Sequence, residues 1–285
     1  MTINDLNLTW AWSPVALGGI ILLCALYVLG IWRGRRRNSQ DMPLKAYQVA
    51  AFAVAILAMA FVLLTPVDSI ARTQLFSVHM AQIVTLTTLC APLLWIASPS
   101  WLLQPLLART GIRRISQALT HPLVASLAFN LTFLIWHAPT LYHLALNHES
   151  LYHLEMLSLL FVALLNWWPL LGSLHELRRL SYPMQMLYVF LDGQPIDVFA
   201  FLLVFSGAVF YPWYAVPPQL HISAFNDQAV GGALLLLPGL VDLLVMSPLF
   251  FRWLAQVEER NRANDQRLHE LAEAEEAARH NTPVS

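Results

Sequence analysis

Long hydrophobic stretches separated by short polar segments dominate the chain from one end to the other. The hydrocarbon core of a bilayer is about 30 Å thick, so a crossing helix needs roughly 20 apolar residues. Seven stretches approach or exceed that length, and we predict an all-α polytopic membrane protein, a seven-helix transmembrane bundle. The predicted spans cover residues 12–32, 46–67, 79–98, 121–137, 154–172, 182–210 and 230–251.

The last part of the chain has a different character. After Phe251 the sequence becomes polar, and from Glu258 to Arg279 positive and negative charges alternate with alanine and leucine. This pattern is typical of a solvated helix. We therefore predict a transmembrane domain over residues 1–255 and a charged cytoplasmic tail over residues 256–285.

Overall composition agrees with a membrane protein. The chain is 58% hydrophobic and 12% charged, about half the charged fraction of soluble domains. Its net charge of -1 gives no reason to expect a nucleic-acid partner, so the expected surroundings are a lipid bilayer.

The placement of the basic residues predicts the orientation. All but one of the 16 lysines and arginines fall in the first, third and fifth loops and in the tail, and the exception is Arg72 in the second loop. Loops rich in lysine and arginine stay in the cytoplasm. We therefore expect the N-terminus outside and the C-terminus in the cytoplasm.

Histidines gather on the predicted outer side. Of the ten histidines, His79, His137 and His153 lie at the outer ends of three spans, and His143 lies in an outer loop. Histidine is the commonest metal ligand, so the three helix-end residues predict a metal site if they converge. The alternative is that each imidazole is an interfacial anchor or a hydrogen-bond donor at a helix end.

Neighbouring residues extend this candidate site. Met156 follows His153 by three positions, which puts both on one helix face, and a thioether beside imidazoles suits Cu(I). Glu155, Asp227 and His143 are candidates for auxiliary contacts or for holding a ligating ring. Asp227 is equally compatible with capping a helix N-terminus.

Three carboxylates lie within the predicted hydrocarbon zone. Charged groups at this depth are costly and commonly functional. Asp192 and Asp242 fall at similar depth in consecutive spans, which predicts that they approach one another, and Asp197 lies one turn and a half from Asp192. The alternative is that these groups are protonated and hydrogen-bonded.

Signatures of enzymes are missing from the sequence. It contains no HExxH, no GxSxG and no phosphate-binding glycine loop. We predict no catalytic residues and a protein that is not an enzyme.

A series of short motifs runs in order along the chain. They are FSVHMAQ at 76–82 with APLL at 91–94, WHAPTLY at 136–142, LYHLE at 151–155, WWPL at 167–170, LSYP at 180–183, YPWY at 211–214 and DQAVGG at 227–232. Together they resemble the CtaG-type cytochrome c oxidase assembly factors associated with caa-type oxidases. The similarity extends from about residue 76 to residue 251.

The resemblance implies a role in assembling a haem-copper oxidase in the cytoplasmic (inner) membrane. It implies that the histidines at 79, 137 and 153 matter most, and we expect copper to be bound or delivered at the outer face. Expected partners are haem-copper oxidase subunits or other copper chaperones. Many members have further histidines where Ile83 and Met156 stand here, so this chain does not have a four-histidine site.

Two other functions fit parts of the same pattern. Histidines on two helices can hold haem b in a membrane oxidoreductase, which requires imidazoles that face each other at matching depth. A copper transporter requires ligands at successive depths along one path, and the inner half of this chain offers carboxylates.

Overall fold

The computed structural model describes residues 6, 8–10, 13–37, 44–107, 110–174 and 180–280 of the chain. The structure is 85% helical, and no strand occurs within these ranges. The all-α prediction is therefore confirmed.

Six helices are long and apolar enough to cross a membrane. A seventh crossing is present if α7 (Thr110–Leu119) and α8 (Pro122–Trp136), which meet at 66°, count as one bent span. The polytopic helical architecture is thus confirmed, with the predicted seven crossings as the upper number. The other crossings are α1 (Pro14–Arg37), α2 (Ala46–Leu64), α4 to α5 (Phe76–Ala97), α10 (Glu149–Leu171), α11 (Tyr182–Phe205), and α12 (Ala224–Leu235) followed by α13 (Leu237–His280).

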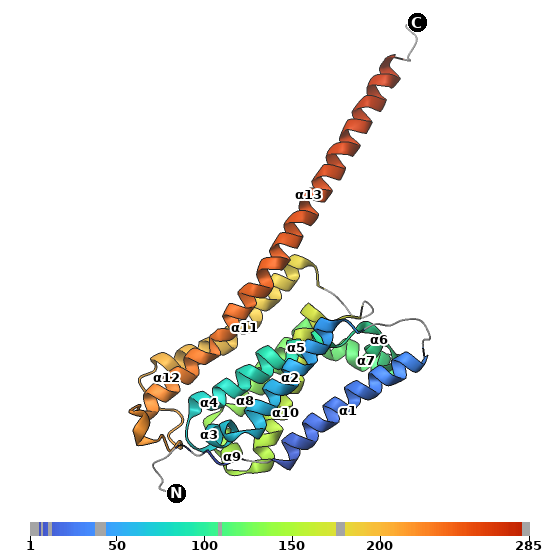
Figure 1. The fold of residues 1–285 in the computed structure, drawn as a ribbon. Coiled ribbons are helices and arrows are strands. Elements are labelled where there is room, and N and C mark those ends of the chain that lie inside the picture. Colours follow the sequence, from blue (N-terminus) through green and yellow to red (C-terminus); the bar gives the residue numbers. More distant parts are fainter. Residues whose placement is uncertain are drawn as a thin grey trace.

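Short helices cover the two ends of the bundle. α3 (Pro66–Thr73) and α9 (Pro139–Asn147) lie at one end, and α6 (Ser100–Leu107) and α7 lie at the opposite end (Figure 1). α13 leaves the bundle toward the end that carries α6 and α7. The segments predicted to be cytoplasmic and those predicted to be external therefore lie at opposite ends.

Several helix ends differ from the predicted span boundaries. The third crossing begins at Phe76 and the fifth at Glu149, because both helices extend outward past the hydrophobic stretch. The sixth ends at Phe205, where Gly207 adopts a left-handed conformation (φ 68°) that ends the helix. The seventh is divided into α12 and α13 shortly before Pro238, which lacks an N–H for the helical ladder.

Some residues used in the sequence-based predictions lie outside the described residues. They are Trp12 at the start of the first span, Arg109 in the third loop, Arg178 and Arg179 in the fifth loop, and residues 281–285 of the tail. The described part of the tail is a direct continuation of α13.

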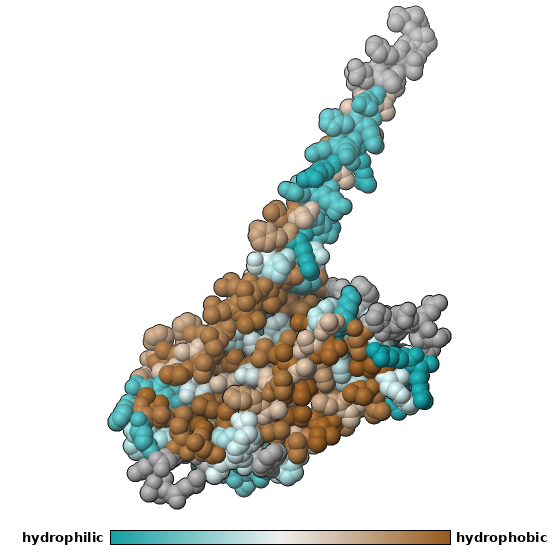
Figure 2. All heavy atoms as spheres, in the orientation of Figure 1, coloured by the Kyte–Doolittle hydropathy of each residue, from teal (hydrophilic) through white to brown (hydrophobic). Residues whose placement is uncertain are grey.

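Large apolar side chains cover the outside of the bundle, as expected for contact with lipid. Leu57, Leu123 and Leu244 each expose about 70% of their surface. Figure 2 shows a continuous hydrophobic surface over the bundle and a hydrophilic surface on the projecting part of α13. The interior is rich in aromatic residues instead, among them Phe76 and Phe133, which are almost completely buried.

A π-helical segment, Thr85–Cys90, joins α4 to α5 within the third crossing. In a π-helix the carbonyl of Thr87 would pair with the N–H of residue 92, but residue 92 is proline and has none. The indole Nε1 of Trp167 donates to this carbonyl instead, at 2.8 Å. A neighbouring helix thus satisfies the backbone group that the proline frees, as a membrane interior requires.

Candidate metal centre

Two histidines and one glutamate meet inside the bundle near the end that carries α3 and α9. His79 lies on α4, His137 directly follows α8, and Glu155 lies on α10. One ligand atom from each side chain lies within 4.8 Å of the others, and all three side chains are buried. Three helices therefore bring together donor atoms of the kind that bind transition metals. We call these three residues the His–His–Glu cluster.

His79 is positioned by the attachment of α4 to α12. The Asp227 carboxylate accepts hydrogen bonds from the backbone N–H groups of Phe76 (2.7 Å) and Ser77 (3.3 Å) and from the Ser77 hydroxyl. Phe76 also packs so closely on Gly231 that a Cβ there would lie 2.5 Å from its Cδ1 atom. These contacts fix the first turn of α4, and His79 follows within one turn.

One ring nitrogen of His137 is hydrogen-bonded, and the other has no partner among the described residues. Its Nδ1 lies 2.7 Å from the carbonyl oxygen of Phe133, one turn earlier. A carbonyl oxygen only accepts, so Nδ1 carries the proton and Nε2 keeps a lone pair. Nε2 is buried and has no hydrogen-bond partner among the described residues. A histidine held by a carbonyl in this way is oriented for metal binding through its other nitrogen.

The Glu155 carboxylate is paired on one oxygen only. Its Oε1 lies 3.2 Å from Nε2 of His79, while its Oε2 and the Nδ1 of His79 have no hydrogen-bond partner in the described structure. Within the same residues, no lysine or arginine forms a salt bridge with Glu155. Burying a carboxylate without a cationic partner is costly. A cation bound beside Glu155 offsets that cost.

Aromatic rings enclose the cluster. Phe133 stacks on the His137 ring with centroids 4.1 Å apart, and Tyr142 lies edge-on to His79 at 5.1 Å. The Tyr142 hydroxyl is hydrogen-bonded to that of Tyr214. Burial raises the pKa of both hydroxyls well above the ordinary value, so they stay neutral. Ligand atoms in this setting lie in a buried, low-dielectric interior, which strengthens their interaction with a cation.

The arrangement fits a metal ion. Each of the three side chains has a buried nitrogen or oxygen atom without a partner, and together they provide two imidazoles and a carboxylate. Such a donor set suits divalent copper and zinc.

The comparisons with known proteins identify a family. The model of the cytochrome c oxidase caa3 assembly factor family matches residues 25–256, well over half of the chain. The chain belongs to this family. No curated protein and no solved structure matches it. The resemblance found in the sequence motifs is therefore confirmed, and the protein belongs to a family of oxidase assembly factors.

In this assembly factor His153 does not point toward the His–His–Glu cluster. Its Nε2 lies 2.8 Å from the hydroxyl of Ser13, the residue before α1, and 3.3 Å from a Glu149 carboxylate oxygen. His153 and Glu155 are two positions apart on α10, which separates them by about 200° around the helix. Only one of the two can face α4 and α8, and that residue is Glu155. The residue expected to have an auxiliary role is thus the one beside the histidines.

The other predicted residues are distributed around the same end of the bundle. Met156 is buried in the core directly after Glu155. His143, on α9, stacks on Trp213 with ring centroids 4.5 Å apart. Asp227 caps the N-terminus of α4, which is a helix other than its own, so the capping role was foreseen but on the wrong helix.

A buried polar network next to the cluster was not foreseen. The Asp68 carboxylate accepts hydrogen bonds from the Tyr152 hydroxyl (3.0 Å) and the Gln82 amide (3.1 Å), and Tyr152 also donates to Gln82 (2.8 Å). Burial raises the pKa of the Asp68 carboxyl, and these hydrogen bonds oppose the rise. The sequence offered one signal, since Asp68 and Arg72 are the charged residues of the short second loop.

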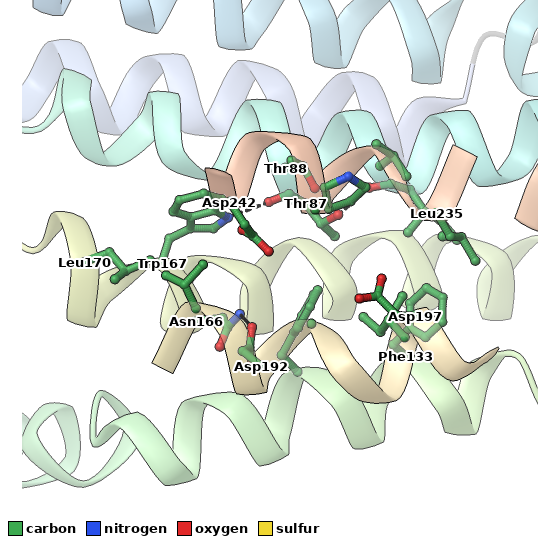
Figure 3. Close-up of a pocket in the computed structure, with 18 of the residues that line it drawn as sticks. Thr87, Thr88, Phe133, Asn166, Trp167, Leu170, Asp192, Asp197, Leu235 and Asp242 are labelled. Atoms are coloured by element: carbon green, nitrogen blue, oxygen red, sulfur yellow. Dashed lines mark hydrogen bonds between the residues drawn. The ribbon is translucent and has the colours of Figure 1, made fainter. Parts of the chain in front are cut away.

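The three intramembrane carboxylates line one cavity of about 70 Å³ between α4, α10, α11 and α13. Asp192 accepts hydrogen bonds from the side-chain amides of Asn130 and Asn166. Figure 3 shows Asp192 beside Asn166 and Asp242 on the opposite side of the cavity from Asp192. Asp197 lies farther along the cavity (Figure 3). Asp197 and Asp242 each place an oxygen within 3.7 Å of the site that a side chain at Gly193 would occupy. Asp192 and Asp242 thus line a common cavity.

Proposed function

We propose that this assembly factor holds one copper ion between His79, His137 and Glu155 and passes it to a haem-copper oxidase during assembly. The observation that carries this proposal is the convergence of three buried ligand atoms within 4.8 Å. Membership of the oxidase assembly family supplies the biological setting. The role is non-catalytic, because the cluster binds and releases an ion without changing a substrate.

The unpartnered atoms support a cation over a purely structural network. A buried polar atom that lacks a hydrogen bond costs free energy, about 1–3 kcal/mol for each neutral group. The cluster contains three such atoms, one on each side chain. An ion held between the three side chains would offset this cost at several atoms at once, whereas a single hydrogen bond would not.

The donor set favours copper in its divalent form. Among divalent first-row metals, sites built from nitrogen and oxygen ligands bind copper most tightly. The thioether of Met156, expected from the sequence to favour Cu(I), is a neighbour of Glu155 in the chain and is buried. It stays a predicted auxiliary ligand, and replacing it tests whether the reduced ion is also held.

The proposed location of the site is the outer face of the cytoplasmic membrane. The cluster lies toward the end of α3 and α9, opposite the end that carries the basic third loop (Figure 1). With the orientation expected from the positive-inside rule, copper enters and leaves on the outer side. The proposed partners there are oxidase subunits or another copper chaperone.

The two rival functions have less support from the geometry. A porphyrin between His79 and His137 needs a wide open slot at the ligating nitrogens, yet Nε2 of His79 lies 3.2 Å from the Glu155 carboxylate and Tyr142 packs against both imidazoles. An absorption spectrum of the purified protein tests for haem. A transporter needs soft ligands along the path, and the cavity below the cluster holds aspartates. Copper uptake into vesicles that contain the protein tests for transport.

Copper binding to the purified full-length protein tests the proposal. We expect one copper ion per chain, and we expect Glu155→Gln, which keeps the shape and removes the charge, to weaken binding at least tenfold. His153→Ala is the matched control, because this residue lies on the same helix and faces away. Equal binding by wild type and Glu155→Gln, or no binding by wild type, contradicts the copper site.

Deletion of the gene tests the assembly role separately. Oxidase activity in the membrane should fall and should be restored by the wild-type chain. Added copper should restore part of the activity if copper delivery is the missing step. Undiminished oxidase activity in the deletion strain contradicts the assembly role for that oxidase.

A further inference from the structure

A large crevice separates α1 from the rest of the bundle at the end that carries the arginines. Its volume is about 850 Å³, within the range of roughly 300–1,000 Å³ that is usual for small-molecule sites. Most of its lining is apolar and aromatic, and it includes Leu26, Phe52, Trp95 and Trp101. This crevice is far from the His–His–Glu cluster, which lies toward the other end of the bundle.

α1 touches the bundle at few points. Tyr27 stacks on Phe52 of α2 and donates a hydrogen bond to the carbonyl of Ala97 (3.0 Å). One turn farther along, Gly30 and Gly34 face α6 so closely that any side chain at either position would clash. Only 6% of the 18-residue apolar stretch of α1 is buried. These contacts hold α1 beside the bundle without closing the space between them.

A space of this size and polarity within a membrane has one natural occupant. Water is poorly accommodated where most walls are apolar, and in hydrocarbon the available apolar molecules are the acyl chains of lipids. The crevice is not enclosed, and Leu26 and Leu29 in its lining also belong to the exposed apolar surface of α1. An acyl chain therefore has both access and matching chemistry.

The mouth of the crevice is positively charged. Arg33 and Arg36 belong to its lining, and no aspartate or glutamate does among the described residues. Both arginines are exposed, and the Arg36 guanidinium lies over the Trp32 ring at 3.8 Å. A ring contact of this kind leaves the edge of the guanidinium free to donate hydrogen bonds. Arginine pairs bind phosphate oxygens strongly, and basic pockets between membrane helices bind anionic lipid headgroups.

We propose that this crevice binds one anionic phospholipid, with its phosphate on Arg33 and Arg36 and an acyl chain between α1 and the bundle, against Trp95 of α5 and Leu164 of α10. The lipid fills the gap that the helix contacts leave open and joins α1 to the bundle. The site is independent of the copper proposal, because it shares no residue with the His–His–Glu cluster. It discriminates lipids by headgroup charge and not by chain type.

Lipid titration of the purified protein, followed by native mass spectrometry, tests the proposal. Phosphatidylglycerol and phosphatidylcholine with identical chains are compared. We expect wild type to bind the anionic lipid about tenfold more tightly, and this comparison needs no variant. Equal affinity for the two lipids overturns the proposal.

Variants locate the site. The double change Arg33→Gln and Arg36→Gln should abolish the headgroup preference. The matched control is Arg113→Gln with Arg114→Gln on α7, at the same end of the bundle, and it should keep the preference. Leu26→Trp, which fills the crevice, should weaken the binding of both lipids. An unchanged preference in the first double variant, or an equal loss in the control, overturns the assignment.

Inorganic phosphate distinguishes a lipid site from a simple anion site. An excess of free phosphate should leave phosphatidylglycerol bound, because the acyl chain contributes most of the contact. Displacement by phosphate at the same concentration as the lipid overturns the lipid assignment. Binding of copper in the same samples reports on the other end of the molecule and separates the two proposals.

Discussion

The Nε2 atom of His79 lies 3.2 Å from Oε1 of Glu155, and neither side chain has any exposed surface. In a low-dielectric interior each group strongly affects the charge of the other. Removal of either partner leaves the other buried without compensation, a situation that is more costly than replacing both. Single substitutions at this pair therefore report on folding as well as on metal binding.

His137 offers a cleaner test of the metal site. Its Nε2 has no partner to lose, so His137→Ala should remove a ligand while the protein remains in the membrane. We expect copper affinity to fall by at least about 100-fold, the upper end of the 10- to 100-fold typical of losing a residue that only supports a ligand. His153→Ala, which removes contacts to Ser13 and Glu149, should change the affinity little.

Met156 completes this comparison. Met156→Leu keeps the volume and removes the sulfur, so it should weaken copper binding less than His137→Ala does. Copper-binding measurements under oxidising and under reducing conditions give the affinity of each variant for Cu(II) and for Cu(I). A His153→Ala loss as large as that of His137→Ala would return His153 to the ligand set predicted from the sequence.

The buried carboxyl of Asp68 predicts that the stability of the folded protein depends on pH. Burial raises the pKa of its carboxyl in the folded protein above the ordinary value of 3.8, so the folded state holds the proton more tightly than the unfolded state does. The contribution of the protonated Asp68 carboxyl to the stability of the folded protein is complete below pH 3.8. It is lost as the pH rises through the pKa that this carboxyl has in the folded state. Asp68→Asn, which cannot ionise, should therefore gain thermal stability relative to wild type as the pH rises from 4 to 8.

A second substitution separates charge from hydrogen bonding at this position. Asp68→Leu removes one acceptor from the Tyr152 hydroxyl and one from the Gln82 amide, which keep Gln82 Oε1 and the Val62 carbonyl as partners. The loss should cost about 0.5–1.5 kcal/mol for each hydrogen bond at every pH. Thermal unfolding in detergent measures both variants. A constant difference between wild type and Asp68→Asn across this pH range would show that Asp68 does not change its protonation there.

The stability of the protein should depend more on the hydrogen-bonding oxygens of Asp192 than on its charge. Asp192→Asn keeps an acceptor for Asn130 and Asn166, whereas Asp192→Leu leaves the Asn166 amide without its acceptor. The Asn130 amide keeps the backbone carbonyls of Ser126 and residue 192, so we expect the leucine variant to be less stable by about 1–3 kcal/mol for the single unpaired amide. Asp197, which lines the same cavity, is the control position, and Asp197→Leu should be tolerated better. Equal stability of the two Asp192 variants would contradict this account.

Topology is tested by reporter fusions. The charge distribution predicts that fusions after Ser150 and Asn226 report the outer side and that one after Leu174 reports the cytoplasm. The first two positions lie at the starts of α10 and α12, and the third follows α10. A cytoplasmic signal at Ser150 would place the His–His–Glu cluster at the inner face.

The fold was largely predictable because membrane spans are set by length and hydrophobicity alone. Two of the three clustered residues, His79 and His137, were also predictable from their positions at helix ends. Glu155 was assigned a lesser role because the rotation of α10 about its axis is set by packing. His153 and Glu155 lie on different faces, and hydrophobic periodicity does not distinguish them in a helix that is apolar on all sides.

The interior of the third crossing was unpredictable for a related reason. Its π-helical turn adds a residue between His79 and Pro92, so a constant period of 3.6 residues fails across Thr87. The partner of the Thr87 carbonyl, Trp167, is 80 positions away in the chain. A contact of that separation depends on the packed bundle and leaves no local signal.

The unbroken length of α13 gives the molecule a mechanical property. The helix includes Asp242 of the buried cavity and continues to His280, and its part beyond Arg252 is about 42 Å long at 1.5 Å per residue. A tilt of about 10° at the membrane would move the far end by roughly 7 Å at this length. A rearrangement around Asp242 that tilts α13, whose interior also contains Pro248, would therefore displace the far end of the helix by several ångströms.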